Sequence, residues 1–456
     1  MVTRTLAAVA REVNGELIGK DASFDVVAID TRSLSSGALF VAIRGDHFDG
    51  NDFVAHAHSL GAAGALVSNP AAVALPQVRV NDTRKAFGQM AHAWRSNFSL
   101  PVVAVTGSNG KTTVKELIAS ILRVRGQFCV TQGNLNNDIG VPLTLMRLNE
   151  EDQVLVVELG ANRAGEIAYL SELTCPTVGI ITNADSTHLE GFGSLRGVAA
   201  AKGELMDCLP PTGVAVLNAD DRYCDDWRRR SRAKTIVTFG FSGEADCCVS
   251  GETNFGSSSS RFTLRLPRGE LLEINLPLPG RHNVLNALAA AAVTFALGTS
   301  STDIAQGLGE ARAVDGRLNI LRGRRGSTIV DDSYNANPAS ARAALEYLAG
   351  KEGRRVLVLG DMAELGPGAG QLHSEVGEYA KDRCDTLIAI GRFSRFAAEA
   401  FGDGAHMCAD IDAAKDWLAR LLASDVTVLV KGSRAMGLEA LVGHLIEENS
   451  KIEVGP

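Results

Sequence analysis

The sequence predicts a three-domain α/β protein. A chain of 456 residues has room for about three domains of ordinary size. Short β-branched runs alternate with helical stretches after Pro101, and a second series of this kind starts near residue 315. We therefore expect a small α/β domain over 1–82, a central domain with a parallel sheet and a small antiparallel addition over 83–314, and a C-terminal Rossmann-like domain over 315–456.

The first segment mixes short strands with helical pieces. Its predicted strands are FDVVAID (24–30), ALFVAIRG (38–45) and GALVS (64–68). Residues 30–53 hold many turn formers and polar side chains, which is typical of a binding loop. A predicted helix over 85–98 then leads into the central segment.

The central segment starts with continuous apolar runs separated by helical stretches. These runs predict buried strands of a parallel sheet: VVAVTG (102–107), VLVVELG (154–160) and TVGIITNAD (177–185). The sequence pattern then changes to short runs in which apolar and polar residues alternate. These runs predict the strands of the antiparallel addition: TIVTFGF (235–241), RFTLRLP (261–267) and LLEINLP (271–277). GETNFGSSSS (251–260) is predicted as a loop, and 281–298 as a long buried helix.

The third segment repeats the strand–helix alternation with new strands. These are STIVDDS (327–333), RRVLVLGDM (354–362), DTLIAIG (385–391) and VTVLVKGS (426–433). Apolar strands between helices again favour a parallel sheet covered on both faces, as in a Rossmann-type fold.

The bulk composition excludes several classes of protein. A net charge of −8 argues against nucleic acid as the main partner, because a phosphate backbone needs a basic footprint. The eight cysteines show no CxxC pair or Cys/His metal spacing, which favours reduced thiols. The first residues do not read as a secretory signal, and the longest apolar run, 287–298, is too short to span a bilayer. We expect a cytoplasmic protein that does not insert into membranes.

The segment 103–116, VAVTGSNGKTTVKE, reads as a phosphate-binding loop between a strand and a helix. A glycine-rich turn there aims backbone N–H groups at an anion, and the helix N-terminus adds positive charge. Lys111 is expected to reach the β- and γ-phosphates, and Thr112 to contact Mg²⁺. Val105 stands where the common nucleotide-hydrolase spacing has a glycine, so we expect a shorter loop. The predicted loop residues are Gly107, Ser108, Asn109, Gly110, Lys111, Thr112 and Thr113.

Three further side chains are candidates for chemistry. Glu158 ends an apolar strand, where parallel sheets form their ligand crevice, so we predict a magnesium ligand. From the residues alone, a structural role is the favoured interpretation for His188. For Lys202, the favoured interpretation is a lysine whose aliphatic chain is partly buried. Lys202 follows three alanines on a predicted helix, and an apolar setting lowers a lysine's pKa and leaves some neutral amine.

Further motifs run in order along nearly the whole chain. They are TGSNGKTT (106–113), GNLNNDIGVPLTLMRL (133–148), ELGANRAGEI (158–167), HLEGFGS (188–194), AAAKGEL (199–205), LPGRHNVLNALAA (278–290), DDSYNANPAS (331–340) and GDMAELG (360–366). Together they resemble the Mur ligase family, whose enzymes build the peptide stem of the cell wall. The last two motifs are similar to the member that adds D-alanyl-D-alanine to UDP-N-acetylmuramoyl-tripeptide. The resemblance therefore implies a monomeric ATP-dependent ligase with these two substrates and an acyl-phosphate intermediate.

The resemblance also implies two Mg²⁺ ions and a catalytic set. Thr112, Glu158, His188 and Lys202 would hold the metals, and Lys202 would carry a carbamate formed from CO₂. The expected catalytic residues are Lys111, Glu158, His188 and Lys202.

Asn283 and Asn286 share one helix face, because they are three residues apart. The residues alone leave adenine contacts and polar helix positions equally open, and the resemblance favours adenine, with Arg281 and His282 beside them. Arg317 is predicted to cross to the phosphates. Asp332 suits a ribose hydroxyl. The alternatives for these two are a surface ion pair and a turn cap.

The two peptide substrates are assigned to opposite ends of the chain. By resemblance the UDP-linked substrate would contact Thr31, Arg32, Phe48, Asp49, Asn134, Asn136, Asn137 and Asn162. Asn51 stands where the family pattern has histidine, and the closely spaced asparagines could equally form turns. The expected contacts of D-alanyl-D-alanine are Tyr334, Asn335, Asn337, Lys431, Ser433 and Arg434.

Other functions stay open at this level. A folylpolyglutamate synthase-like ligase shares the central chemistry but lacks a domain for a UDP-sugar, and another Mur ligase would add a single amino acid. A nucleotide-binding regulator without ligase activity would leave Glu158, His188 and Lys202 without a purpose. Dependence of phosphate release on both substrates separates these alternatives.

Overall fold

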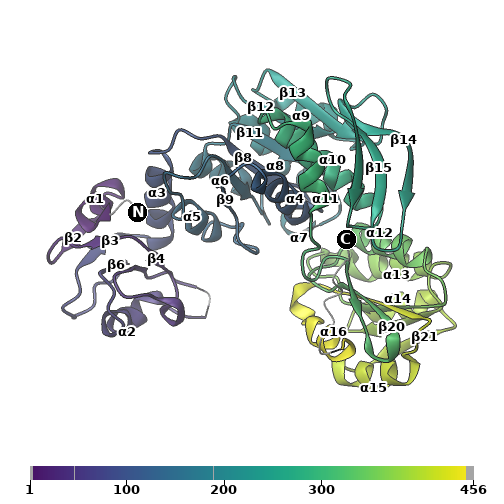
Figure 1. The fold of residues 1–456 in the computed structure, drawn as a ribbon. Helices are drawn as coiled ribbons and strands as arrows, with labels where there is room; N and C mark the ends of the chain where they lie inside the picture. Colours follow the sequence, from purple (N-terminus) through teal and green to yellow (C-terminus); the bar gives the residue numbers. More distant parts are fainter. Residues whose placement is uncertain (1–3, 46, 188, 448–456) are drawn as a thin grey trace.

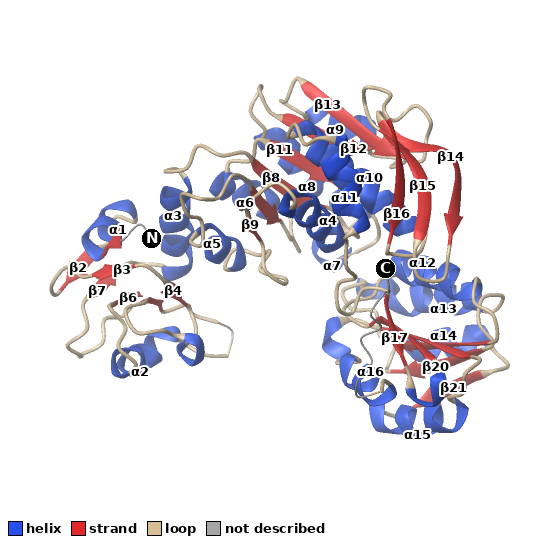
Figure 2. Cartoon of the chain, viewed as in Figure 1, coloured by secondary structure: helices blue, strands red, loops and turns tan. Residues whose placement is uncertain are grey.

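The structure is a computed structural model that describes residues 4–45, 47–187 and 189–447. Figure 1 shows three α/β units joined in a bent row, with the first at the left, the central unit at the top and the third at the lower right. Each unit is built on its own sheet, of five, nine and six strands respectively. Helices lie against all three sheets (Figure 2).

The first unit has a five-stranded sheet in the order β2-β7-β6-β5-β4. The strands β4 to β7 pair in parallel, and β2 pairs antiparallel with β7. Its elements are β1 (Arg4–Thr5), α1 (Leu6–Glu12), β2 (Glu16–Ile18), β3 (Ser23–Phe24), β4 (Val27–Ala28), the 3-10 helix Thr31–Ser33, β5 (Leu39–Val41), the 3-10 helix Gly50–Phe53, α2 (Val54–Ser59), β6 (Gly64–Val67) and β7 (Gln77–Arg79).

The prediction of one strand over 24–30 is wrong. β3 pairs antiparallel with β1, whereas β4 joins the five-stranded sheet. The chain breaks between them at Asp25 and Val26, which are both exposed. The apolar run therefore contributes one strand to each of two different sheets.

Helix α3 (Thr83–Arg95) connects the first two units. Phe87 and Met90 pack into the core of the first unit, whereas Ala91 and Trp94 pack into the core of the central unit. Asp82 caps the helix by accepting hydrogen bonds from two backbone N–H groups of its first turn. Because α3 contributes to both cores, it fixes the first unit to the second.

The central sheet has the order β16-β15-β14-β13-β12-β11-β8-β10-β9. The strands from β9 to β14 pair in parallel. Its elements are β8 (Val102–Thr106), α4 (Lys111–Arg123), β9 (Cys129–Val130), α5 (Gly140–Leu145), β10 (Leu155–Glu158), α6 (Glu166–Thr174), β11 (Val178–Ile181), α7 (Leu189–Phe192), α8 (Leu195–Cys208), β12 (Val214–Asn218), α9 (Cys224–Arg230), β13 (Thr235–Gly240), β14 (Cys247–Phe255), β15 (Ser260–Arg265), β16 (Leu271–Leu276), α10 (Arg281–Ala296) and α11 (Ser301–Gly309).

The antiparallel addition extends the same sheet and differs from the prediction in two respects. β13 pairs in parallel with both of its neighbours, so the antiparallel pairs are β14–β15 and β15–β16. The predicted loop 251–260 is strand as far as Phe255. Gly251 has a φ of 80°, close to the irregularity in the β14–β15 register. The glycine therefore marks a bulge rather than the end of the strand.

The predicted long buried helix is confirmed as α10. Its residues 287–293 have no exposed surface, and four of them are alanines in a row. α10 packs against α4, the helix that follows the phosphate-loop sequence, on one face of the central sheet. Small side chains let two helices approach closely, so α10 brings Asn283 and Asn286 to that loop.

The third unit has the sheet order β17-β18-β22-β19-β20-β21. Only β17 is antiparallel, and it was not predicted, nor was β21 at the other edge. Its elements are β17 (Asn319–Arg322), the 3-10 helix Arg324–Gly326, β18 (Thr328–Asp332), α12 (Pro338–Ala349), β19 (Arg354–Gly360), the 3-10 helix Gly366–Gly368, α13 (Ala369–Ala380), β20 (Thr386–Ile390), α14 (Ser394–Phe401), β21 (Ala405–Cys408), α15 (Ile411–Leu421), β22 (Val426–Lys431), the 3-10 helix Arg434–Met436 and α16 (Glu439–Leu445).

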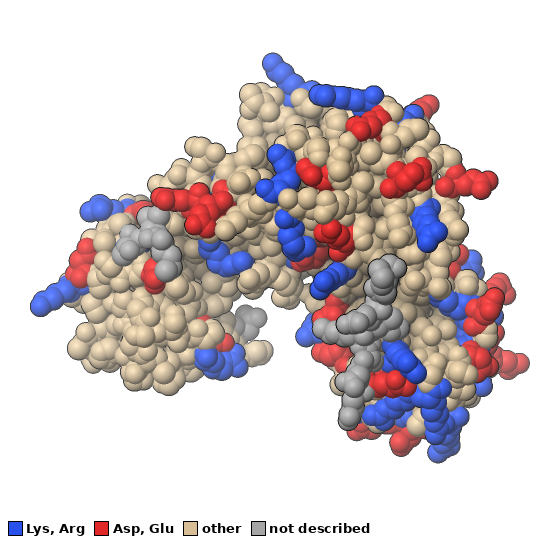
Figure 3. Space-filling model, viewed as in Figure 1, with Lys and Arg blue, Asp and Glu red and all other residues tan. Residues whose placement is uncertain are grey.

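The surface carries both signs of charge over all three units. On the face in Figure 3, lysine and arginine are interspersed with aspartate and glutamate, without a continuous basic tract. The face in Figure 3 therefore lacks a basic tract of the kind that binds nucleic acid. Within the part of the chain that the structure describes, no helix combines the length and the apolar character needed to cross a bilayer.

Candidate active site

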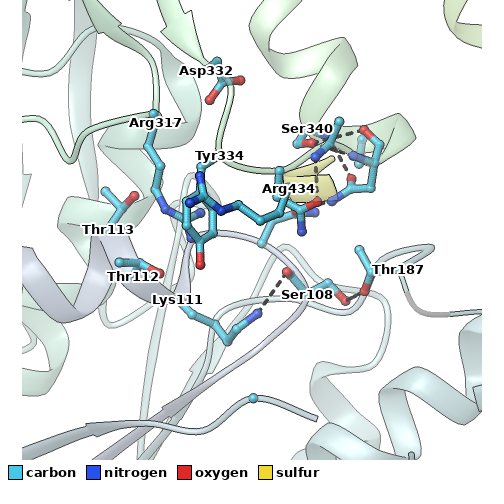
Figure 4. Close-up of a pocket in the computed structure, with 18 of the residues that line it drawn as sticks. Ser108, Lys111, Thr112, Thr113, Thr187, Arg317, Asp332, Tyr334, Ser340 and Arg434 are labelled. Carbon is cyan, nitrogen blue, oxygen red and sulfur yellow. Dashed lines mark hydrogen bonds between the residues drawn. The ribbon is translucent and has the colours of Figure 1, made fainter. Parts of the chain in front are cut away.

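A cavity of about 790 Å³ lies between the central and third units, where the phosphate loop faces the ends of β18 and β22 (Figure 4). Most of the predicted site residues line it. These are Ser108, Asn109, Gly110, Lys111, Thr112, Thr113, Asn136, Asn137, Glu158, Asn162, Asn283, Asn286, Arg317, Asp332, Tyr334, Asn335, Asn337, Lys431, Ser433 and Arg434. The residues predicted for three different ligands thus share one chamber.

The remaining predicted residues lie elsewhere. Gly107, Asn134 and Lys202 are not among the lining residues, and Thr31, Arg32, Phe48 and Asp49 belong to the first unit. His188 falls outside the described residues, so its predicted role stays a prediction.

The phosphate loop connects β8 to α4 through two glycines that no other residue could replace without strain. Gly107 and Gly110 have φ values of 147° and 81°. A Cβ on Gly107 would lie 1.9 Å from the hydroxyl of Thr182, and one on Gly110 would lie 2.4 Å from Oδ1 of Asn286. The loop is therefore packed tightly between β11 and α10, and its helix N-terminus points into the cavity.

Lys111 folds back over this loop. Its Nζ donates to the backbone carbonyls of Gly107, at 2.7 Å, and Ser108, at 3.2 Å. Burial lowers the pKa of Lys111, while the charge of Glu158 raises it and that of Arg317 lowers it again. Glu158 and Arg317 both line the cavity, so the pKa of Lys111 depends on charged groups of the same site.

The hydroxyl of Ser108 is saturated by contacts within the protein. Its Oγ donates to the carbonyl of Asp185, at 3.1 Å, and accepts from the N–H of Asp185, at 2.9 Å, and from the hydroxyl of Thr187, at 3.0 Å. A serine hydroxyl has one donor and two acceptor positions, and all three are used. Ser108 therefore fixes the loop to residues 185–187 instead of offering its side chain to a phosphate.

We expect Ser108→Ala to lower kcat/KM for ATP about tenfold, because it leaves the N–H of Asp185 without its acceptor and leaves the hydroxyl of Thr187 only the longer contact with the carbonyl of Asp185, at 3.4 Å. Steady-state kinetics with ATP as the varied substrate measures the change. Ser257→Ala is the control, since that serine is exposed and its side chain makes no hydrogen bond in the structure. Equal kinetics of the two variants would contradict the assigned role.

Glu158 presents one free carboxylate oxygen to the site. The residue is 1% exposed, and its Oε1 accepts a hydrogen bond from Asn136 Nδ2 at 2.8 Å. Its Oε2 is buried and has no hydrogen-bond partner. A buried carboxylate oxygen without a donor is costly unless a cation completes it, and hard cations such as Mg²⁺ take oxygen ligands. Glu158 therefore fits the predicted role of metal ligand.

Lys202 lies on α8 with only 1% of its surface exposed. Burial, followed by repulsion from Lys111, lowers the pKa of its ammonium to about 7. Its Nζ lies 5.5 Å from the ring centroid of Phe192. A large fraction of neutral amine at neutral pH is what carbamate formation requires. Within the described residues, no three His, Cys, Asp or Glu side chains are grouped closely enough to hold a metal, so the proposed metal set depends on Thr112 and Lys202 as well.

The asparagines on α10 meet the cavity as the helical spacing predicts. Asn283 and Asn286 are 5% and 8% exposed, and both line the cavity beside the phosphate loop. Asn283 also donates to the carbonyl of Pro279 at 2.8 Å, so part of its amide serves the helix start. Arg281 stacks at 3.6 Å over the ring of Phe241 and is not among the lining residues, whereas His282 lines the cavity.

The third unit closes the cavity with an aromatic and charged surface. Arg317 and Arg434 both extend toward Tyr334, with their guanidinium carbons 4.5 Å and 5.8 Å from its ring centroid (Figure 4). Lys431 is buried, and its Nζ donates to Asp332 Oδ2 at 2.5 Å and to the carbonyl of Asn335 at 3.1 Å. Asp332 also accepts from the N–H of Leu318. The carboxylate of Asp332 is thus bound within the protein by Lys431 and Leu318, and its predicted contact with a ribose hydroxyl stays a prediction.

Asn337 joins the two units directly. It caps α12 through its side-chain oxygen, and its Nδ2 donates to Oδ1 of Asn109 in the phosphate loop at 2.6 Å. A second contact lies at the tip of the β14–β15 hairpin, where the carbonyl of Ser257 accepts from Tyr347 of α12 and from Lys351, which follows that helix. The side chain of Asn337 therefore connects the phosphate loop with the third unit, a role that the sequence did not predict.

The asparagines after β9 have separate roles. Asn136 holds Glu158, whereas Asn137 accepts hydrogen bonds from the backbone N–H groups of residues 139 and 140 and so starts α5. Asn134 is exposed. The turn-forming alternative is therefore observed for Asn137, while Asn136 and Asn137 both reach the cavity.

The predicted UDP residues of the first unit are at least partly exposed: Arg32 and Phe48 are exposed, and Thr31 and Asp49 are half-buried. Arg32 pairs with Asp30 at 2.6 Å, and this guanidinium lowers the pKa of Asp30 to about 2. Phe48 is 58% exposed. Asn51 donates to Asp49, at 2.6 Å, and to Ser68, and accepts from the N–H groups of residues 68 and 69. The residue that departs from the family pattern therefore anchors the loop that carries Phe48 and Asp49.

Sequence reasoning missed Lys115, Asn183 and Thr187. Asn183 and Thr187 line the cavity and bind the loop residues Asn109 and Ser108. Lys115 is fully buried one helical turn after Lys111. The spacing of four residues between the two lysines was a signal that could have identified it.

Family models match this chain in order along its length. They are the Mur ligase family catalytic domain at 23–95, the Mur ligase middle domain at 105–294 and the Mur ligase glutamate ligase domain at 316–434. The UDP-N-acetylmuramoyl-tripeptide–D-alanyl-D-alanine ligase of Escherichia coli K12 is 44% identical over 453 residues, which cover 99% of this chain and 100% of the relative.

Two solved structures are similar over nearly the whole chain. A structure of MurF from Acinetobacter baumannii has a TM-score of 0.91 at 35% identity, with 97% of this chain and 98% of that chain covered. MurF ligase from Thermotoga maritima in complex with ADP has a TM-score of 0.80 at 28% identity, with 92% and 96% covered.

Proposed function

The chain belongs to the Mur ligase family, and we infer that it joins D-alanyl-D-alanine to UDP-N-acetylmuramoyl-tripeptide with ATP as the energy source. The observation that carries this function is the shared cavity. It brings the phosphate loop, the half-free carboxylate of Glu158 and the Tyr334–Lys431–Arg434 surface of the third unit into one space. An ATP-driven amide synthesis needs these three regions together.

Amide formation from a carboxylate requires activation, since a carboxylate is a poor electrophile. The tripeptide carboxylate attacks the γ-phosphorus of ATP, the bond to the β–γ bridging oxygen breaks, and ADP leaves. The amine of the dipeptide then attacks the acyl carbon, loses its proton and displaces phosphate. Lys111 and the helix N-terminus offset the charge that repels the incoming carboxylate. The loop contacts of Ser108 and Asn109 keep those groups in place during both steps.

We propose that Thr112, Glu158, His188 and Lys202 hold two Mg²⁺ ions. The free Oε2 of Glu158 and the buried, partly neutral amine of Lys202 support this assignment. Bound Mg²⁺ supplies charge neutralisation at the phosphates. Lys202 gains oxygen ligands for this purpose if its neutral amine bonds to the carbon of CO₂ and releases a proton.

The adenine, ribose and phosphate assignments follow from the same cavity. We propose that Asn283 and Asn286 contact adenine, because both line the cavity from α10 and Asn286 lies next to Gly110. Arg317 is proposed to contact the phosphates, because it lines the cavity and its charge acts on Lys111 of the phosphate loop. Asp332 is assigned to a ribose hydroxyl.

The first unit is proposed to hold the UDP end of the tripeptide substrate. Thr31, Arg32, Phe48 and Asp49 are proposed to contact the UDP end, and Asn134, Asn136, Asn137 and Asn162 the remainder of this substrate; Asn136, Asn137 and Asn162 line the cavity. Domain boundaries at 82/83 and 314/315, a monomeric state and a cytoplasmic location complete the proposal.

The alternatives predicted from the sequence are less well supported. A folylpolyglutamate synthase-like ligase has no use for a UDP-sugar domain, and residues 23–95 match the Mur ligase family model. A ligase that adds a single amino acid is disfavoured by the relative that is 44% identical over 99% of the chain and acts on D-alanyl-D-alanine by name. A regulator without ligase activity would gain nothing from a buried half-free carboxylate beside a phosphate loop.

The reaction predicts where one oxygen atom goes. Oxygen-18 placed in the terminal carboxylate of the tripeptide is expected to appear in the released phosphate, because the acyl phosphate keeps that oxygen on phosphorus when the amine displaces it. Mass spectrometry of the phosphate measures the transfer. Phosphate release is expected only when the UDP-linked tripeptide and D-alanyl-D-alanine are both present.

Two outcomes would contradict the function. Phosphate without the label would show that ATP is hydrolysed by water. Phosphate release supported by a folate or by a single amino acid in place of the dipeptide would assign the chain to one of the alternatives.

A further inference from the structure

Lys115 is a fully buried lysine that the catalytic scheme does not use. It lies on α4 and has no exposed surface. Its Nζ donates to the carbonyl of Thr131 at 2.7 Å and to the carbonyl of Gly133 at 3.4 Å, and it pairs with Glu116 at 2.7 Å. A buried ammonium is costly unless its hydrogen bonds and its charge are satisfied. Here both needs are met by the segment that follows β9 and by one carboxylate.

The segment 131–136 that Lys115 holds in turn positions Glu158. Thr131 is fully buried, and its hydroxyl accepts a hydrogen bond from the N–H of Glu158 at 3.1 Å. Asn136, at the other end of the segment, donates to Oε1 of Glu158 at 2.8 Å and accepts from the N–H of Gly160. The backbone and the carboxylate of Glu158 are therefore both hydrogen-bonded to the 131–136 segment. Two backbone carbonyls of that segment in turn accept hydrogen bonds from Lys115.

This arrangement leaves the orientation of Glu158 dependent on a long turn. Gly133 has a φ of 53°, so the chain reverses there without the support of a regular element. Lys115 donates to carbonyls on both sides of residue 132 and thereby closes the turn. Without Lys115, these carbonyls would lose the only charged donor that the described residues give them, and Asn136 would be free to shift relative to Glu158.

We propose that Lys115 is a positioning residue that acts through the 131–136 segment and holds Glu158 with Oε2 free for a cation. The inference rests on the proposed function of Glu158. It also extends to the tripeptide, because Asn136 and Asn137 line the same cavity. Lys111 and Lys115, one turn apart on α4, thus serve the nucleotide and the metal carboxylate from one helix.

The test uses the full-length chain with Lys115→Met, which keeps the side-chain length and removes the donors. Two equilibrium measurements avoid turnover: calorimetric affinity for UDP-N-acetylmuramoyl-tripeptide, and the increase of Tm that Mg²⁺ produces in the presence of ADP. We expect the affinity to fall about tenfold and the Mg²⁺-dependent part of the Tm increase to be lost, whereas the affinity for ADP without Mg²⁺ stays within about twofold. Arg123→Met, an exposed position on the same helix, is the matched control.

Two further variants separate positioning from a general loss of stability. Lys115→Arg retains charged donors and is expected to restore most of the Mg²⁺ response. In the Asn136→Ala background, Lys115→Met is expected to change the ligand responses little further, because the hydrogen bond from Asn136 to Glu158 is already lost.

The proposal is overturned if Lys115→Met lowers Tm but leaves both ligand responses intact, or if its effect adds fully to that of Asn136→Ala. Failure of the proposed function would look different, since the wild-type chain would then show no Mg²⁺-dependent response to ADP.

Discussion

Lys111→Met is expected to lower kcat about 10³-fold while the protein remains folded. The ammonium of Lys111 lies against the carbonyls of Gly107 and Ser108, at the start of α4. A fixed cation there stabilises charge on the transferring phosphoryl group, and single positive groups of this kind are worth about 10³-fold or more in phosphoryl transfer. Methionine keeps the apolar stem and removes the charge.

Formation of the acyl phosphate is the direct measurement for this variant. ATP, the UDP-linked tripeptide and hydroxylamine are mixed without D-alanyl-D-alanine, so that any acyl phosphate is trapped as a hydroxamate. We expect hydroxamate from the wild type and from Lys85→Met, an exposed lysine on α3, but not from Lys111→Met. Normal hydroxamate formation by Lys111→Met would contradict the assigned role of the phosphate loop.

The parts of the site that were predictable from the sequence depend on local geometry. A strand, two glycines, a lysine and a helix within 102–123 can form only a tight turn, and the positive φ values of Gly107 and Gly110 are its consequence. Glu158 was predictable because it ends a continuous apolar strand, and β10 places it at the carboxyl edge of the sheet. The spacing of Asn283 and Asn286 likewise fixed a common helix face.

The parts that were not predictable depend on partners far away in the chain. Asn337 bonds to Asn109 across 228 positions, and neither motif indicates the other. The saturation of Ser108 depends on residues 185 and 187, which follow a different strand. The sequence shows how many hydrogen bonds such a polar side chain can form. Whether those bonds go to a ligand or to other parts of the protein depends on the fold.

The errors in secondary structure have the same origin. Gly251 and Asn254 read as loop residues, yet β15 supplies partners that extend β14 to Phe255. Ala405–Cys408 has little strand pattern and becomes β21 because β20 offers an edge. Pairing across the sheet outweighs local propensity at such edges.

Lys202→Met is expected to lower kcat by about 10²-fold or more without loss of stability. The side chain is buried, so methionine fills the same volume and removes an ammonium that the site disfavours. The pKa of Lys202 is about 7, below its ordinary value of 10.5. Between about 7 and 10.5 the unfolded chain binds more protons than the folded chain, so this lysine makes the free energy of unfolding rise with pH across that window, and its cost is largest below it.

Two measurements at different pH values test the role of Lys202 separately. In CO₂-free buffer at pH 6 the Tm of Lys202→Met is expected to equal or exceed that of the wild type, because the wild-type lysine is forced to carry a buried charge there. At neutral pH, activity of the wild type is expected to fall after CO₂ removal and to recover on addition of bicarbonate, whereas the variant stays inactive under both conditions. The exposed substitution Lys234→Met is the control and is expected to follow the wild type. Full activity of Lys202→Met, or electron density for an unmodified Lys202 in active wild-type crystals at neutral pH, would contradict the carbamate, because an apolar side chain or a free amine offers Mg²⁺ no anionic oxygen.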